Sequence, residues 1–80
     1  MKRLTEDEAI DRITKILAQV DELLANEPND SSKHGGWFNH TRSLIGKADH
    51  YLRYIRQREI VGLNDAIQKR WDDLQSKRRG

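Results

Sequence analysis

The chain has 80 residues, a formal net charge of +2 and no cysteine, and hydrophobic and charged residues each make up 35% of it. A chain of this length forms at most one domain and buries only about 60% of the surface that it exposes when unfolded, so its stability is small. The absence of cysteine excludes disulfide bonds and thiolate metal sites and is consistent with a reducing compartment. We therefore expect one domain, residues 1–80, with a thin core that gains from self-association or from a bound partner.

The start of the chain lacks the pattern of a secretion signal. Its basic residues are followed at once by Glu6, Asp7 and Glu8, where a signal peptide requires an apolar segment. No run of residues approaches the roughly 18 apolar positions that a membrane-spanning helix needs. The sequence therefore predicts a cytoplasmic protein that does not use a membrane as partner.

Charge is distributed unevenly along the chain. Residues 1–36 carry five basic and eight acidic side chains, a balance of −3, whereas residues 37–80 carry ten basic and five acidic ones, a balance of +5. This division predicts that the two halves of the chain present surfaces of opposite sign.

A first helix is predicted over residues 6–25. Thr5 and Glu8 form the capping-box pattern, in which each side chain satisfies a backbone N–H at a helix start. Apolar residues then recur at spacings of three and four, which places them on one side of a helix, and Pro28 ends the hydrogen-bond ladder. The opposite side of this helix carries the acidic residues Asp7, Asp11, Asp21 and Glu22.

Turn-forming residues fill the next segment, 26–36, which is expected to be a connector. A second helix is predicted over about 37–60. It is expected to start directly after the glycines at positions 35 and 36, because Trp37 is in phase with the apolar stripe that follows.

Gly62 and Asn64 provide a helix end and a new helix start, so a third helix is predicted over about 64–76, followed by a polar, basic tail, 77–80. Three amphipathic helices with short connections predict an all-α fold, a small up-and-down three-helix bundle. A helical hairpin whose long second helix bends at Gly62 fits the same pattern. Homo-oligomerisation, with a dimer favoured, can complete either arrangement.

The sequence holds no recognisable catalytic, cofactor or metal site. His40 and His50 are ten residues apart and point in directions about 80° apart on a helix, and no carboxylate completes a ligand set for His34 or either of them. We expect the histidines to face solvent or to cap helices. No activated nucleophile and no phosphate-binding glycine loop is present, so the chain is not expected to be an enzyme or to bind a cofactor.

The outward face of the second helix is the most informative surface. An exposed tyrosine among arginines is favoured at protein interfaces and for stacking on bases, whereas the plain interpretation is a solvated helix face. The residues of this basic and aromatic face are Arg42, Lys47, His50, Arg53, Tyr54, Arg56 and Arg58. Further basic residues follow at Lys69, Arg70, Lys77, Arg78 and Arg79.

The aromatic residues Trp37, Tyr51 and Trp71 are in phase with the apolar stripes and are assigned to the core. Phe38 lies at the edge of its stripe, where it either covers the connector or meets a second chain.

These features favour a non-catalytic protein-interaction module, a small regulator or inhibitor that docks on a larger protein through its charged helix faces. Accessory proteins of phages and mobile elements often have this character. One alternative is a helical nucleic-acid-binding protein that uses the basic face and the tail on phosphates. A further alternative is a homo-oligomeric structural or assembly component.

Overall fold

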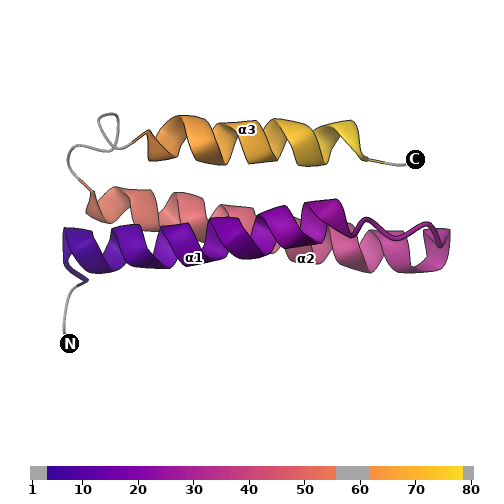
Figure 1. Cartoon of the computed structure of the whole chain (residues 1–80), viewed down its shortest axis with the longest axis horizontal. Coiled ribbons are helices and arrows are strands. Elements are labelled where there is room, and N and C mark those ends of the chain that lie inside the picture. The colour runs from indigo at the N-terminus through magenta and orange to yellow at the C-terminus, as the bar shows by residue number, and fades with distance from the viewer. Residues whose placement is uncertain (1–3, 56–61, 79–80) are drawn as a thin grey trace.

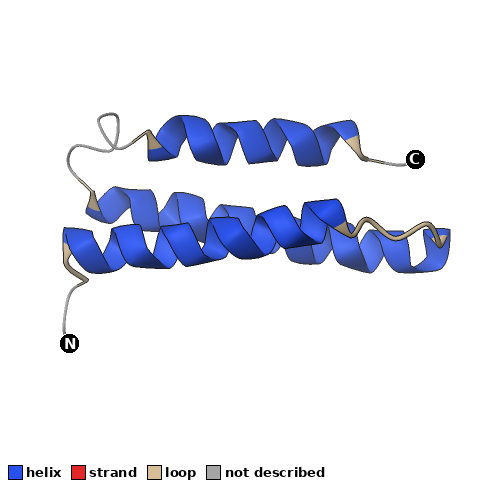
Figure 2. Cartoon of the chain, viewed as in Figure 1, coloured by secondary structure: helices blue, strands red, loops and turns tan. Residues whose placement is uncertain are grey.

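The structure is a computed structural model that describes residues 4–55 and 62–78. Its described residues form three α-helices, α1 (Glu6–Ala25), α2 (Ser31–Tyr51) and α3 (Leu63–Ser76), and no strand (Figure 2). The chain runs along α1, returns along α2 and reverses again into α3 (Figure 1). The predicted all-α, up-and-down three-helix bundle is therefore confirmed. Because α3 runs opposite to α2, the two are separate helices rather than one bent rod.

Helix α1 begins with the expected capping box. The Thr5 hydroxyl accepts a hydrogen bond from the Glu8 backbone N–H at 3.1 Å, and the Glu8 carboxylate accepts one from the Thr5 backbone N–H at 3.4 Å. The helix ends at Ala25, and the Asn26 side-chain amide then donates to the Glu22 carbonyl at 2.7 Å. Its buried side is formed by Ala9, Ile13, Ile16, Leu17 and Val20.

Helix α2 begins at Ser31, six residues before the predicted start, so the prediction that the glycines open this helix is wrong. Asp30 is the N-cap, and its carboxylate accepts hydrogen bonds from the Ser32 hydroxyl at 2.8 Å and from the Ser32 backbone N–H at 3.0 Å. These two hydrogen bonds hold the pKa of Asp30 below its usual value, and the bond from the Ser32 hydroxyl has the larger effect. The cap leaves only residues 26–30 as connector. Gly35 and Gly36 therefore lie inside the helix, with ordinary negative φ.

The α-helical part of α2 ends at Tyr51, short of the predicted end near residue 60. A 3-10 turn, Leu52–Tyr54, follows, and Ile55 is extended; residues 56–60 of the predicted helix lie outside the described residues. Helix α3 begins after Gly62, whose φ of 68° is the left-handed conformation that glycine adopts without strain. Asn64 lies inside α3 and does not cap it.

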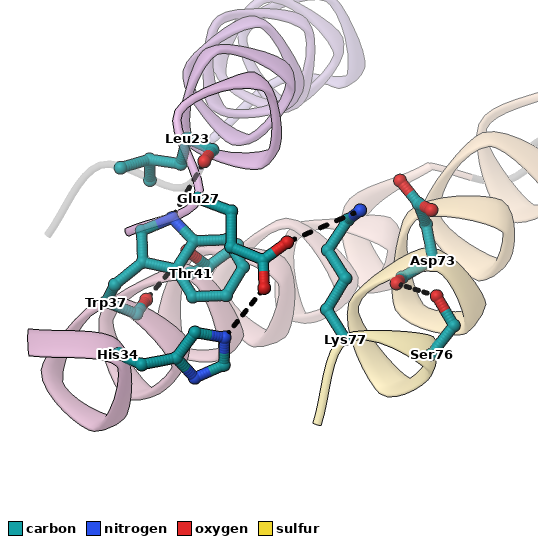
Figure 3. Close-up of polar contacts among 8 residues, drawn as sticks. All are labelled: Leu23, Glu27, His34, Trp37, Thr41, Asp73, Ser76 and Lys77. Carbon is teal, nitrogen blue, oxygen red and sulfur yellow. Dashed lines mark hydrogen bonds and ion pairs between the residues drawn. The ribbon is translucent and has the colours of Figure 1, made fainter. Parts of the chain in front are cut away.

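The core lies mainly between α1 and α2, because α3 contributes only Ile67 and Leu74 as buried residues. Trp37 is 8% exposed, and its indole N–H donates to the Leu23 carbonyl at 2.7 Å, which ties the start of α2 to the end of α1 (Figure 3). The assignment of Trp37 to the core is confirmed, whereas Tyr51 and Trp71 are half-buried and pack against the core from its edge. No helix in the described ranges is both long and apolar enough to cross a membrane.

Candidate functional site

His34 was expected at the surface or at a helix cap, and this expectation is wrong. Its side chain is buried, with 4% exposure for the residue, and its Nε2 lies 2.9 Å from Glu27 Oε2 (Figure 3). The imidazole ring also lies 4.9 Å, centroid to centroid, from the ring of Trp37. The cause is the early start of α2: once residues 31–36 are helical, His34 precedes Trp37 by three residues and falls on the buried side.

Glu27 also meets the end of α3, since Lys77 Nζ lies 3.7 Å from its other carboxylate oxygen, Oε1 (Figure 3). This carboxylate therefore joins the connector to both α2 and α3. Within residues 4–55 and 62–78, no group of three or more His, Asp or Glu side chains could hold a metal ion. The contact between His34 and Glu27 therefore gives the buried imidazole a hydrogen-bond partner within the chain.

A groove runs between α2 and α3, made of two adjoining hollows of about 420 and 370 Å³ that share Trp71. We call it the α2–α3 groove. Its first hollow, the cationic end, is lined by Phe38, Arg42, Trp71, Gln75 and Arg78, among others, and none of the carboxylates that the structure describes lines it. Its second hollow, the acidic end, is lined by Ile45, Gly46, Asp49, Asp65 and Gln68 beside Trp71, and no lysine or arginine of the described ranges 4–55 and 62–78 lines it.

The charged side chains of the α2–α3 groove are not neutralised by other residues that the structure describes. Among the described residues, Arg42, Arg78, Asp49 and Asp65 form no ion pair. Phe38 and Trp71 are half-buried between them. The groove therefore combines apolar rings with uncompensated charge of opposite sign at its two ends, a combination that suits a macromolecular contact.

The predicted basic and aromatic face divides between two surfaces. Arg42 lies in the α2–α3 groove, whereas Lys47, His50, Arg53 and Tyr54 are exposed elsewhere on α2 and its 3-10 turn. The cause is helical geometry, because Lys47 follows Arg42 by five positions, which corresponds to about 140° around the helix. The two remaining members, Arg56 and Arg58, lie outside the described residues.

Three rings meet where α2 ends, and we call His50, Tyr51 and Tyr54 the tyrosine cluster. The ring centroid of His50 lies 6.0 Å from that of Tyr51 and 6.2 Å from that of Tyr54, and the centroids of the two tyrosine rings are 6.5 Å apart. The guanidinium of Arg12 in α1 lies 5.8 Å from the centroid of the Tyr51 ring. Among the described residues, Tyr54 is the one large hydrophobic residue that is exposed, with 38% of its surface accessible to solvent. The sequence did not indicate Arg12, since its place beside Tyr51 follows from how α1 packs on α2.

The predicted acidic face of α1 is partly neutralised. Asp21 accepts two hydrogen bonds from the Arg70 guanidinium of α3, both at 2.9 Å. Asp11 pairs with Lys15 at 2.9 Å. The remaining members of the face, Asp7 and Glu22, are exposed. The acidic side of α1 therefore helps to hold α3 and is not a continuous free surface.

Comparison of the chain with models of protein families, with curated proteins and with solved structures gave no match. The functional assignment therefore depends on the chemistry of the tyrosine cluster and the α2–α3 groove.

Proposed function

We propose that the chain is a non-catalytic protein-interaction module, a small regulator or inhibitor that docks on a larger protein through the tyrosine cluster. The observation that carries this proposal is the state of Tyr54, which is exposed and yet held in ring contact with His50 and Tyr51. Tyrosine and arginine, with tryptophan, are enriched among the few residues that dominate binding energy at protein interfaces. A ring that is already ordered loses less conformational entropy when a partner covers it.

The surroundings of the tyrosine cluster indicate an acidic surface on the partner. Arg12 lies against Tyr51, and Arg53 and Lys47 are exposed nearby in sequence. Cations at the rim of an interface accelerate association with an acidic partner and contribute modestly to affinity. We therefore expect binding that weakens moderately with salt and depends mainly on Tyr54.

Nucleic acid remains the alternative partner, and two contacts favour protein over it. Arg70 and Lys77, which belong to the basic half of the chain, pair with Asp21 and Glu27. Cations that are paired internally are less available to phosphates, and binding to nucleic acid depends on many free ones.

Site-specific photo-crosslinking tests the proposal in the native host. A photoreactive phenylalanine analogue at position 54 is compared with the same analogue at position 18, because Ala18 is exposed on α1. We expect one protein to be captured from position 54 and not from position 18, and mass spectrometry identifies it.

Calorimetry with that purified protein then provides the quantitative test. Tyr54→Ala is expected to weaken binding at least tenfold, or about 1.4 kcal/mol, as for a central interface residue. The control is Gln19→Ala, which truncates an exposed side chain of α1 outside the tyrosine cluster and should bind as the wild type does. Equal crosslinking from both positions, or unchanged binding by Tyr54→Ala, would contradict the proposal. Capture of nucleic acid at position 54 would select the alternative.

A further inference from the structure

We propose that the α2–α3 groove is an interface between two copies of this chain, which pair antiparallel about a two-fold axis perpendicular to the helices. The groove has two arginines at one end and two aspartates at the other, and these four side chains form no ion pair among the described residues. A surface with opposite charges at its two ends is complementary to itself when one copy is reversed end for end. The same surface in parallel would place like charges opposite each other.

Trp71 sets the register of this pairing on α3, because it lines both hollows and so marks the middle of the groove. Arg78 lies seven residues after Trp71 and Asp65 six residues before it. A two-fold axis at the level of Trp71 therefore brings Arg78 of one copy, which follows the end of α3 at Ser76, close to the partner's Asp65, which lies about 9 Å from the axis along the helix. Symmetry repeats this contact on the other side of the axis.

Helix α2 gives a matching register. Arg42 lines the same hollow as Trp71 and marks the level of the axis on α2. Phe38 lies four residues before Arg42, and Gly46 lies four residues after it. The axis therefore places the Phe38 ring opposite the partner's Gly46, where a Cβ atom would meet nothing within 4 Å in a single copy. Because side chains lean toward the N-terminus of their helix, the Arg42 guanidinium extends away from the axis, toward the level of the partner's Asp49.

The size of the groove predicts a weak dimer. From Gly35 to Asp49 it spans fourteen residues of α2, or about 21 Å, and two adjacent helices are about 20 Å wide. The resulting face of about 400 Å² per copy is half of the roughly 800 Å² per partner in a standard interface. We therefore expect a dissociation constant of about 0.1 mM, so that dimers form on concentration and dissociate on dilution.

Charge reversal tests the pairing by sedimentation equilibrium between about 10 µM and 1 mM. Arg78→Asp should weaken dimerisation about tenfold or more, because two symmetric attractions are replaced by two repulsions, each modest at an exposed site. Adding Asp65→Arg to the same chain should restore dimerisation, since both contacts re-form with the signs exchanged. Lys33→Asp is the matched control: Lys33 is exposed on α2 outside the groove, so the same change in net charge should leave dimerisation unchanged.

Three results would overturn the proposal: a wild-type chain that stays monomeric at 1 mM, an Arg78→Asp variant that dimerises as the wild type does, or a double variant that is folded by circular dichroism and does not recover. A chain that does not dimerise through the groove could still dock through the tyrosine cluster, so the two proposals can fail separately. None of the three rings of the tyrosine cluster lines the groove, so Tyr54→Ala should leave dimerisation unchanged.

Discussion

Replacement of the three glycines inside α2 by alanine should stabilise the isolated chain. Gly35, Gly36 and Gly46 lie in regular helix, none has a positive φ, and a Cβ atom added at any of them would meet nothing within 4 Å. Glycine in a helix interior is about 0.8–1 kcal/mol less favourable than alanine, in part because it raises the conformational entropy of the unfolded chain. The triple variant should therefore gain about 2–3 kcal/mol. For a domain of this size, this corresponds to a rise in Tm of roughly 10–20 °C.

Thermal and urea unfolding, followed by circular dichroism at about 5 µM where the monomer predominates, measure this gain. The control is Gly62→Ala, because φ at Gly62 is 68° and a side chain is strained there. This substitution should lower stability by about 1 kcal/mol, opposite in sign to the helical replacements. A triple variant with unchanged or lower Tm would refute the placement of these glycines in open helix.

The same replacements connect stability to association. Gly46 lines the acidic end of the α2–α3 groove, and its lack of a side chain has no packing role within one copy. Gly46→Ala should therefore stabilise the monomer while weakening the dimer, since the added methyl group occupies the space that the pairing assigns to the partner's Phe38.

Three further predictions follow from single contacts. Trp37→Phe should lower the free energy of unfolding in urea by about 1–2 kcal/mol, because it removes the hydrogen bond from the buried indole to a carbonyl of α1; no loss would show that this bond does not hold the two helices. A double-mutant cycle of Asp21→Ala and Arg70→Ala should give a coupling of about 0.5–1 kcal/mol that shrinks in 1 M salt, and zero coupling at low salt would contradict the bidentate pair. Because capping hydrogen bonds lower the pKa of Asp30, its ionised form contributes stability above the unfolded pKa of about 3.9, and this contribution is lost as pH falls through the folded pKa. Asp30→Ala should therefore lower Tm clearly at pH 7 and much less at pH 2; an equal drop at both values would contradict the role of the charge.

The local elements of this fold were largely predictable, because α1 and α3 carry their own signals. The capping box at Thr5 and the spacing of apolar residues define α1. The start of α2 was missed because two adjacent glycines suggested a turn, whereas the cap at Asp30 had already begun the helix. With a helix start at Trp37, His34 lies in the connector, so its burial and its contact with Glu27 could not be predicted.

The surfaces were harder to predict because they depend on packing between helices. The sequence shows one apolar stripe on α2 and one outward face, yet α2 contacts both α1 and α3, so Arg42 lies on the α3 side. Asp21 and Arg70 are 49 residues apart, and no local pattern joins them. The α2–α3 groove with its opposite charges exists only once the register of α3 on α2 is fixed.

The two tryptophans allow the most direct test of the pairing of grooves. In a dilution series followed by NMR, the indole N–H signal of Trp71 should move with concentration, because the groove closes over it in the dimer. The signal of Trp37 should stay fixed, since its indole is buried and bonded to the Leu23 carbonyl in either state. Amide signals of Phe38 and Gly46 should move together with Trp71. Signals that do not change up to 1 mM, or changes confined to the tyrosine cluster, would contradict self-pairing through the α2–α3 groove.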